Sequence, residues 1–227
     1  MRRDLRTATI AVCLLILLLG VVFPLAIEGI SQVAFPGAAN GQQIKLHGRL
    51  VGSAIIGQAF TLPALARDGK PEQVEGRPVM RPDPLLFQSR PSATEPLPDN
   101  AAASAFSNLG PNSKLTEEED AKRIGEYLAL NRPYDPSLTV AKVPVDAVST
   151  SASGLDPEIS LANADIQAHR VAALRHLPLA RVMALVAHYA SGRFLGFAGD
   201  PGVNVLELNL ALERIGVGAS SEGRGSR

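Results

Sequence analysis

Side chains suited to chemistry are few in this sequence, and they form two candidate sets. His169 and His176 lie one heptad apart, and with Asp165 they make a candidate metal-binding group. Ser153, Asp156 and His169 supply the three side-chain types of a nucleophilic triad. A simpler interpretation is favoured for both sets, because solvated helix histidines and serine-rich turns are common. We therefore predict no metal site and no catalytic residue.

Sequence motifs for nucleotide binding and hydrolysis are absent. The nearest approach to a P-loop, Gly69-Lys70, has Ala64 where the pattern needs glycine. No G-x-G-x-x-G, G-x-S-x-G, H-E-x-x-H or C-x-x-C occurs, and no aspartate stands in the D-K-T-G-T setting that P-type pumps phosphorylate. The sequence therefore predicts a chain that is not an enzyme on its own and does not hydrolyse ATP alone.

The longest element that the sequence predicts is an apolar stretch over residues 7–27, which carries no formal charge. As a helix it covers about 30 Å, the hydrocarbon thickness of a bilayer. Glycine and proline in its second half are better tolerated in a membrane helix than in a soluble one. We predict a transmembrane anchor, with contributions from Leu14, Leu18, Gly20 and Pro24.

The charges that flank this stretch predict its orientation. Arg2, Arg3 and Arg6 precede it, and the first basic residue after it is Lys45. Because positive residues stay on the cytoplasmic side, we expect residues 1–6 inside the cell and the remainder outside, with the chain held in the bacterial cell (inner) membrane by a single pass. The alternative is a cleaved signal peptide with small residues near 37–39, but signal cores are usually shorter than this stretch.

The composition of the remaining chain fits one domain with an aliphatic core. Lys plus Arg and Asp plus Glu number 22 each, so no excess charge attracts nucleic acid. The aromatic residues are seven Phe, three Tyr and no Trp. The only cysteine, Cys13, lies in the apolar stretch, so a disulfide in the outer domain is excluded. Membrane lipid is the expected surrounding of the apolar stretch.

Two segments predict little regular structure. Residues 61–89 are rich in proline, which excludes a continuous helix or a central strand. We expect a surface insertion without effect on the core, ordered in part where Leu85, Leu86 and Phe87 dock. Residues 218–227 consist mainly of glycine, serine and charged residues, and we expect a disordered tail.

About three helices and a small sheet are predicted between residues 28 and 217. Thr116 and Glu119 form a capping-box pattern for a helix that ends before Pro133. Ser160 caps a second helix, and Pro178 begins a third. Residues 50–58 and 143–148 are expected to be extended, and 203–210 to be a strand that runs into a helical turn. The fold class is α+β, with helices covering one side of the sheet.

Short motifs in a fixed order then connect this sequence to a known family. They are Gly52-Ser53, Ile56–Phe60, Arg90–Thr94, Ser107–Pro111, Val143-Pro144, Ser151–Ser160, Gln167, Arg170–Ala172, Pro201 and Val203–Leu212. The series resembles the KdpC family, the C subunit of the bacterial high-affinity potassium-transporting ATPase, up to about residue 212. One departure concerns Ala105 and Phe106, which stand where the family commonly has two glycines that let a phosphate approach.

The resemblance implies a non-catalytic accessory subunit of an ATP-driven potassium importer. Its implied partners are a channel-like potassium-binding subunit and a P-type ATPase subunit, and potassium is the ion that the complex transports. ATP is a ligand by resemblance only, through a proposed chaperone role that raises ATP affinity at the ATPase subunit. That role conflicts with an outer domain, since ATP is cytoplasmic.

Five polar residues in the matching loops are the candidates for contacts with a ligand or partner: Gln58, Arg90, Ser92, Asn108 and Asp156. Each also has a purely structural interpretation, such as fixing a turn. Two other functions stay open. One is a membrane-anchored, exported module that binds a small ligand and acts alone. The other is an exported hydrolase that uses the serine-rich loops.

Overall fold

The computed structural model describes residues 1–66, 68–74, 76–193 and 195–222, with the side chains of 77 and 216–222 excepted. The chain forms two compact units, Met1–Ser53 and the part that begins at Ala54. Most contacts are made within one unit or the other, and the boundary falls directly after a β-hairpin.

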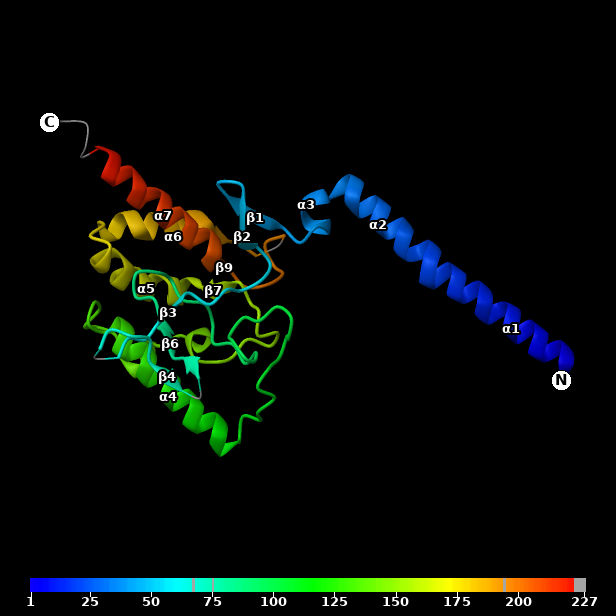
Figure 1. Ribbon diagram of the computed structural model, residues 1–227, viewed down its shortest axis with the longest axis horizontal. Coiled ribbons are helices and arrows are strands. Elements are labelled where there is room, and N and C mark those ends of the chain that lie inside the picture. Colours follow the sequence, from blue (N-terminus) through cyan, green and yellow to red (C-terminus); the bar gives the residue numbers. More distant parts are fainter. Residues whose placement is uncertain (67, 75, 194, 223–227) are drawn as a thin grey trace. The chain divides into compact units, whose positions relative to one another are not determined.

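The first unit is dominated by one uninterrupted helix over Arg2–Ala34, made of α1 (Arg2–Leu17), a π-helical turn η1 (Leu18–Val22) and α2 (Phe23–Ala34) (Figure 1). It is 33 residues long and contains the predicted apolar stretch, and its most apolar 18-residue window has no buried residue. The π turn directly precedes Pro24, whose ring and missing N–H disturb an ordinary helical turn. A helix of this length and hydropathy is a candidate membrane span.

A short helical turn and a hairpin complete the first unit. α3 (Pro36–Ala39) is followed by β1 (Gln43–Leu46) and β2 (Arg49–Ser53), which pair antiparallel. The Asn40 amide donates to Gln32 Oε1 over 3.0 Å, and Ser53 Oγ donates to the Gly41 carbonyl over 2.6 Å. The strand expected over 50–58 therefore ends at Ser53.

The core of the second unit confirms the α+β class. β7 (Glu158–Ser160), β9 (Gly202–Asn204) and β8 (Ala190–Ser191) form an antiparallel sheet with β9 in the centre. α5 (Leu161–Leu174), α6 (Leu179–Tyr189) and α7 (Val205–Glu222) pack beside it (Figure 1). The spacing of Ala164, Ala168, Val171 and Leu174 predicts an apolar stripe on α5, of which the first three are fully buried and Leu174 is half-buried. The Asn163 N–H donates to Ser160 Oγ over 3.1 Å, which confirms that cap.

Several local predictions are wrong in detail. α4 (Lys114–Asn131) begins after Ser113, and Thr116 Oγ1 donates to the Gly110 carbonyl over 2.9 Å, so the expected capping box does not form. Two 3₁₀ turns, η2 (Val140–Lys142) and η3 (Val145–Ala147), lie between α4 and β7, and η3 falls within residues 143–148, which were expected to be extended. α7 runs to Glu222, so the expected tail is helical over 218–222, and residues 223–227 lie outside the described residues.

The proline-rich segment is built from two short antiparallel ladders. β3 (Thr61–Pro63) pairs with β6 (Met80–Pro82), and β4 (Gln73–Val74) pairs with β5 (Arg77–Pro78). As predicted, it contains neither a long helix nor a central strand. Its end, however, belongs to the core, because the Phe87 side chain is 0% exposed. The expectation that the segment has no effect on the core is therefore wrong for residues 84–88.

Side chains from the helices hold this end of the segment by its backbone. Asn209 on α7 accepts from the Phe87 N–H over 2.9 Å and donates to the Phe87 carbonyl over 3.0 Å. Gln167 on α5 does the same for Gln88, at 2.7 and 3.1 Å. These paired contacts replace a neighbouring strand, and they fix the chain just before Arg90.

Arg170, Gln167 and Asn209 together hold the backbone of residues 84–88, and we call these three side chains the clamp. Arg170 is 0% exposed. Its guanidinium donates to the carbonyls of Pro84 and Leu86, to Asn131 Oδ1 and to Gln167 Oε1, at 2.9–3.1 Å. Burial lowers the pKa of Arg170 to about 10, although the nearby Tyr127, Tyr134 and Asp83 oppose this shift. The guanidinium therefore keeps its charge at neutral pH, and its charge-assisted donors are used by neutral acceptors.

Candidate functional site

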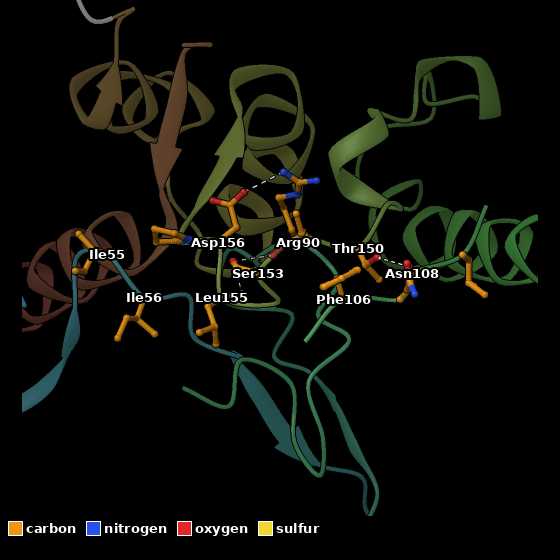
Figure 2. Close-up of a pocket in the computed structure, with 14 residues that line it drawn as sticks. Ile55, Ile56, Arg90, Phe106, Asn108, Thr150, Ser153, Leu155 and Asp156 are labelled. Atoms are coloured by element: carbon orange, nitrogen blue, oxygen red, sulfur yellow. Dashed lines mark hydrogen bonds and ion pairs between the residues drawn. The ribbon is translucent and has the colours of Figure 1, made fainter. Parts of the chain in front are cut away.

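A groove of about 760 Å³ lies in the second unit where four segments of the chain meet (Figure 2). It is lined by Ile55, Ile56, Arg90, Phe106–Leu109, Thr150–Ser153 and Leu155–Pro157. Three of the five predicted contact candidates line it, namely Arg90, Asn108 and Asp156. The volume is within the range of ligand-binding pockets in proteins.

An ion pair forms the polar centre of the groove. Arg90 Nη1 lies 2.9 Å from Asp156 Oδ2, and the two side chains are 26% and 32% exposed. Asp156 Oδ1 accepts from the Glu158 N–H over 3.1 Å, which fixes the carboxylate. Arg90 Nη2 reaches Ser149 Oγ only at 3.5 Å, and its Nε is buried without a hydrogen-bond partner among the described residues. The guanidinium thus has donor capacity that the protein does not use.

The other two candidates lie outside the lining. Gln58 is exposed, and its backbone carbonyl accepts from Ser89 Oγ over 3.0 Å. Ser92 Oγ donates to the Gly154 carbonyl over 2.8 Å and accepts from the N–H groups of Thr94 and Asp99. Ser92 therefore does not line the groove, and its hydroxyl connects the backbones of residues 94, 99 and 154.

Gly154 lets the loops of the groove approach each other. Its φ of +70° belongs to the left-handed region, and a Cβ there would lie 2.5 Å from the Ala105 carbonyl and 2.6 Å from Thr94 Cγ2. Next to it, the Ser153 carbonyl accepts from Ser104 Oγ over 2.7 Å and from the Ala105 N–H over 3.2 Å. Only glycine fits here without displacing the loop that carries Phe106.

The structure does not assemble either of the candidate sets for chemistry. Ser153 Oγ contacts Ser151 Oγ and the Leu155 N–H, Asp156 pairs with Arg90, and no hydrogen bond of the described residues joins Ser153, Asp156 or His169 to one another. The described part of the chain holds no group of three His, Cys, Asp or Glu side chains placed to bind a metal, and Asp165, His169 and His176 are no exception.

Sequence reasoning missed several residues that build the groove. Phe106, 60% exposed, lines it, although the sequence marked this residue only as a restriction on the approach of a phosphate. Thr150 Oγ1 donates to Ser107 Oγ over 3.2 Å across the groove. Ile55, 51% exposed, stands at another edge. The signal that could have found them is their position within or beside the motifs that carry the family resemblance.

Asp99 is a further polar residue that the sequence did not single out. Burial, and then the negative charge of Asp156, raise the pKa of Asp99 to about 6. Its Oδ1 would lie 2.8 Å from a Cβ on Gly57, and the Asp156 carbonyl would lie 2.7 Å from the same point. A second carboxyl group therefore lies near the backbone of Asp156 and feels the negative charge of that residue.

This carboxyl predicts a pH dependence of stability. Between about pH 4 and 6 the folded chain keeps the Asp99 proton while the unfolded chain loses it, so the free energy of unfolding falls as the pH rises. Over this pH range the free energy of unfolding of Asp99→Asn should fall by about 1 kcal/mol less than that of the wild type, because asparagine does not titrate. This value is discounted for the partial exposure of the Asp99 side chain. Urea unfolding of the detergent-solubilised chain, followed by near-UV circular dichroism of its three Tyr, measures it. Asp200→Asn, at a side chain that is 92% exposed, is the control and should keep the wild-type profile.

The fold and the groove define a class before any comparison: a candidate single-span protein with one α+β domain that carries a surface groove. Compared with known proteins, residues 5–214 match the family described as "KdpC: K+-transporting ATPase, c chain". The chain therefore belongs to this family, as the ordered motifs indicated.

Curated relatives agree over almost the whole chain. A potassium-transporting ATPase KdpC subunit of Herminiimonas arsenicoxydans is 41% identical over 214 residues, which is 94% of this chain and 99% of the relative. A subunit of the same name from Methylibium petroleiphilum is 44% identical over 213 residues, 94% of this chain and 98% of the relative. Membership makes the chain a non-catalytic, accessory subunit of a membrane potassium-transporting ATPase.

Proposed function

We propose that this chain is the anchored accessory subunit that stabilises an ATP-driven, high-affinity potassium import complex. The observation that carries the proposal is the family match over residues 5–214, which includes nearly all of the apolar helix as well as the outer domain. Its partners are then a channel-like potassium-binding subunit and a P-type ATPase subunit. Both present membrane helices against which an exposed span can pack.

We further propose that residues 28–222 stand outside the cell, over the outer mouth of the potassium-binding subunit. The support is the placement of Arg2, Arg3 and Arg6 before the span, with no basic residue after it until Lys45. On that side the groove faces the outer surfaces of the partner subunits. Gln58, Arg90, Asn108 and Asp156 are then contact residues, while Ser92 supports them.

A role in raising ATP affinity is compatible with this arrangement only if it acts through assembly. ATP is cytoplasmic, and the two charged residues that line the groove, Arg90 and Asp156, neutralise each other. Ala105 and Phe106 also restrict close approach of a phosphate to the backbone. We therefore expect no ATP bound by the outer domain itself.

A second function is favoured by the groove alone. A volume of about 760 Å³ accommodates a small ligand, as an anchored binding module that acts by itself would need. Such a module should purify as a stable single chain with its ligand. The accessory subunit should instead purify with its partners, and this difference decides between the two.

Co-purification from detergent, with an exchanged anchor, tests the proposal. Replacing residues 7–27 with an unrelated apolar span should leave the domain exported and yet lower recovery of the two partner subunits about tenfold, because specific helix packing is lost. In the native span, Gly20→Leu is the finer variant, and Cys13→Ser at another position of the same helix is its control. Full recovery with the foreign span would reduce the anchor to a tether, and absence of the partners from the wild-type preparation would refute the function.

A further inference from the structure

The loop that carries Phe106 has unused hydrogen-bond donors along the groove. Among the described residues, no acceptor is found for the backbone N–H groups of Phe106, Ser107 and Asn108. Asn108 itself has a φ of +52°, which turns the chain there. Together with the partly used guanidinium of Arg90, whose Nη2 reaches Ser149 Oγ only at 3.5 Å, these groups leave hydrogen-bond donors open along the groove.

The apolar side chains of the groove are only partly covered by the protein. Phe106 is 60% and Ile55 51% exposed, and Leu109 and Leu155 are half-buried beside them (Figure 2). Large apolar side chains gathered at one concave surface with polar groups between them are typical of an interaction site. A ligand for this surface therefore needs apolar groups as well as acceptors.

The charges of the groove select against an anion. The positive charge of Arg90 is already paired with Asp156, and a second carboxyl, Asp99, lies behind Gly57. A phosphate or a carboxylate would meet the Asp156 carboxylate in the groove, and the one cation that lines the groove, Arg90, is already shared with that carboxylate. Acceptors that carry no full charge, such as peptide carbonyls, fit this arrangement better.

We infer that the groove binds an extended, uncharged polypeptide segment with apolar side chains, presented by a partner subunit on the same side of the membrane. The carbonyls of that segment accept from the Phe106–Asn108 N–H groups and from Arg90, while its side chains pack on Phe106 and Ile55. The mode is that of a peptide laid along an open backbone edge, in which main-chain bonds give affinity and apolar pockets give selectivity. The inference rests on the proposed function, because it requires a partner subunit.

Site-directed cross-linking in the assembled complex tests the inference. Cys13 is the only cysteine of this chain, so Cys13→Ser gives a subunit without thiols, which can be labelled before it is combined with its partners. In that background, Phe106→Cys and Val140→Cys are labelled with a photoactivatable benzophenone maleimide, and the cross-linked peptides are identified by mass spectrometry. The two positions have nearly equal exposures of 60% and 58%, but Val140 lies on η2, outside the groove.

The expected result is a cross-link from position 106, and none from position 140, to a partner segment without charged residues. Phe106→Glu should lower the affinity of the partners about tenfold, and Val140→Glu should leave it within about twofold. A cross-link from position 106 to lipid, to a second copy of this chain or to a charged segment would overturn the inference, as would protection of position 106 by excess ATP. If the labelled variants co-purify with the partners but position 106 does not cross-link, the inference fails and the proposed function stands.

Discussion

Replacing Arg170 with methionine is expected to destabilise the α+β domain by about 3–5 kcal/mol. Methionine fills part of the space but donates no hydrogen bond. The carbonyls of Pro84 and Leu86, Asn131 Oδ1 and Gln167 Oε1 would then lose a charged donor, and the site is fully buried. Urea unfolding followed by near-UV circular dichroism measures the loss.

Arg175 provides a matched control on the same stretch of chain. It follows α5 directly, and its Nε donates to the Leu85 carbonyl over 2.7 Å, but the side chain is only half-buried. Water can replace that donor, so Arg175→Met should cost about 1 kcal/mol or less. Equal losses for Arg170→Met and Arg175→Met would show that burial of the clamp is not what stabilises residues 84–88.

Gly154→Ala is expected to cost about 2–4 kcal/mol and to weaken partner binding. The backbone conformation accounts for about 1 kcal/mol, and the close contacts with the Ala105 carbonyl and Thr94 account for the rest. Relief of those contacts would push the loop that carries Phe106 away from Gly154. We therefore expect a loss of co-purifying partners even under conditions in which the domain remains folded.

Gly69→Ala separates the two causes. Gly69 has a φ of +79°, and no atom of the residues that the structure describes lies within 4 Å of the Cβ position. Its substitution should therefore show the conformational cost alone, about 1 kcal/mol, with partner binding unchanged. A loss for Gly154→Ala no larger than that for Gly69→Ala would show that the close approach of the groove loops is unimportant.

Local chemistry explains which parts of the fold the sequence predicted. The long apolar helix, the Ser160 cap and the burial of Ala164, Ala168 and Val171 on α5 depend on neighbours within a few residues, and all three are confirmed. The capping box at Thr116 is wrong because the chain already turns at Gly110, where the Ser113 N–H donates to the Gly110 carbonyl. The competing turn moved the helix start to Lys114.

Contacts over long sequence separations explain what the sequence did not predict. Phe87 is held by Asn209, 122 residues away, and no pattern within residues 61–89 indicates such a contact. Arg90 and Asp156 were singled out through the family resemblance, and their 2.9 Å contact joins positions 66 residues apart. The raised pKa of Asp99 depends on burial by other segments, which the sequence does not display.

The side of the membrane on which the outer domain stands is the most direct test of the account. In the Cys13→Ser background, Glu118→Cys on the exposed surface of α4 and Asp4→Cys before the span report on the two ends of the chain. A membrane-impermeant maleimide, applied to cells whose inner membrane is intact and accessible, should label Glu118→Cys at once and Asp4→Cys only after that membrane is permeabilised. Labelling of Asp4→Cys with protection of Glu118→Cys would place the domain in the cytoplasm and contradict the account.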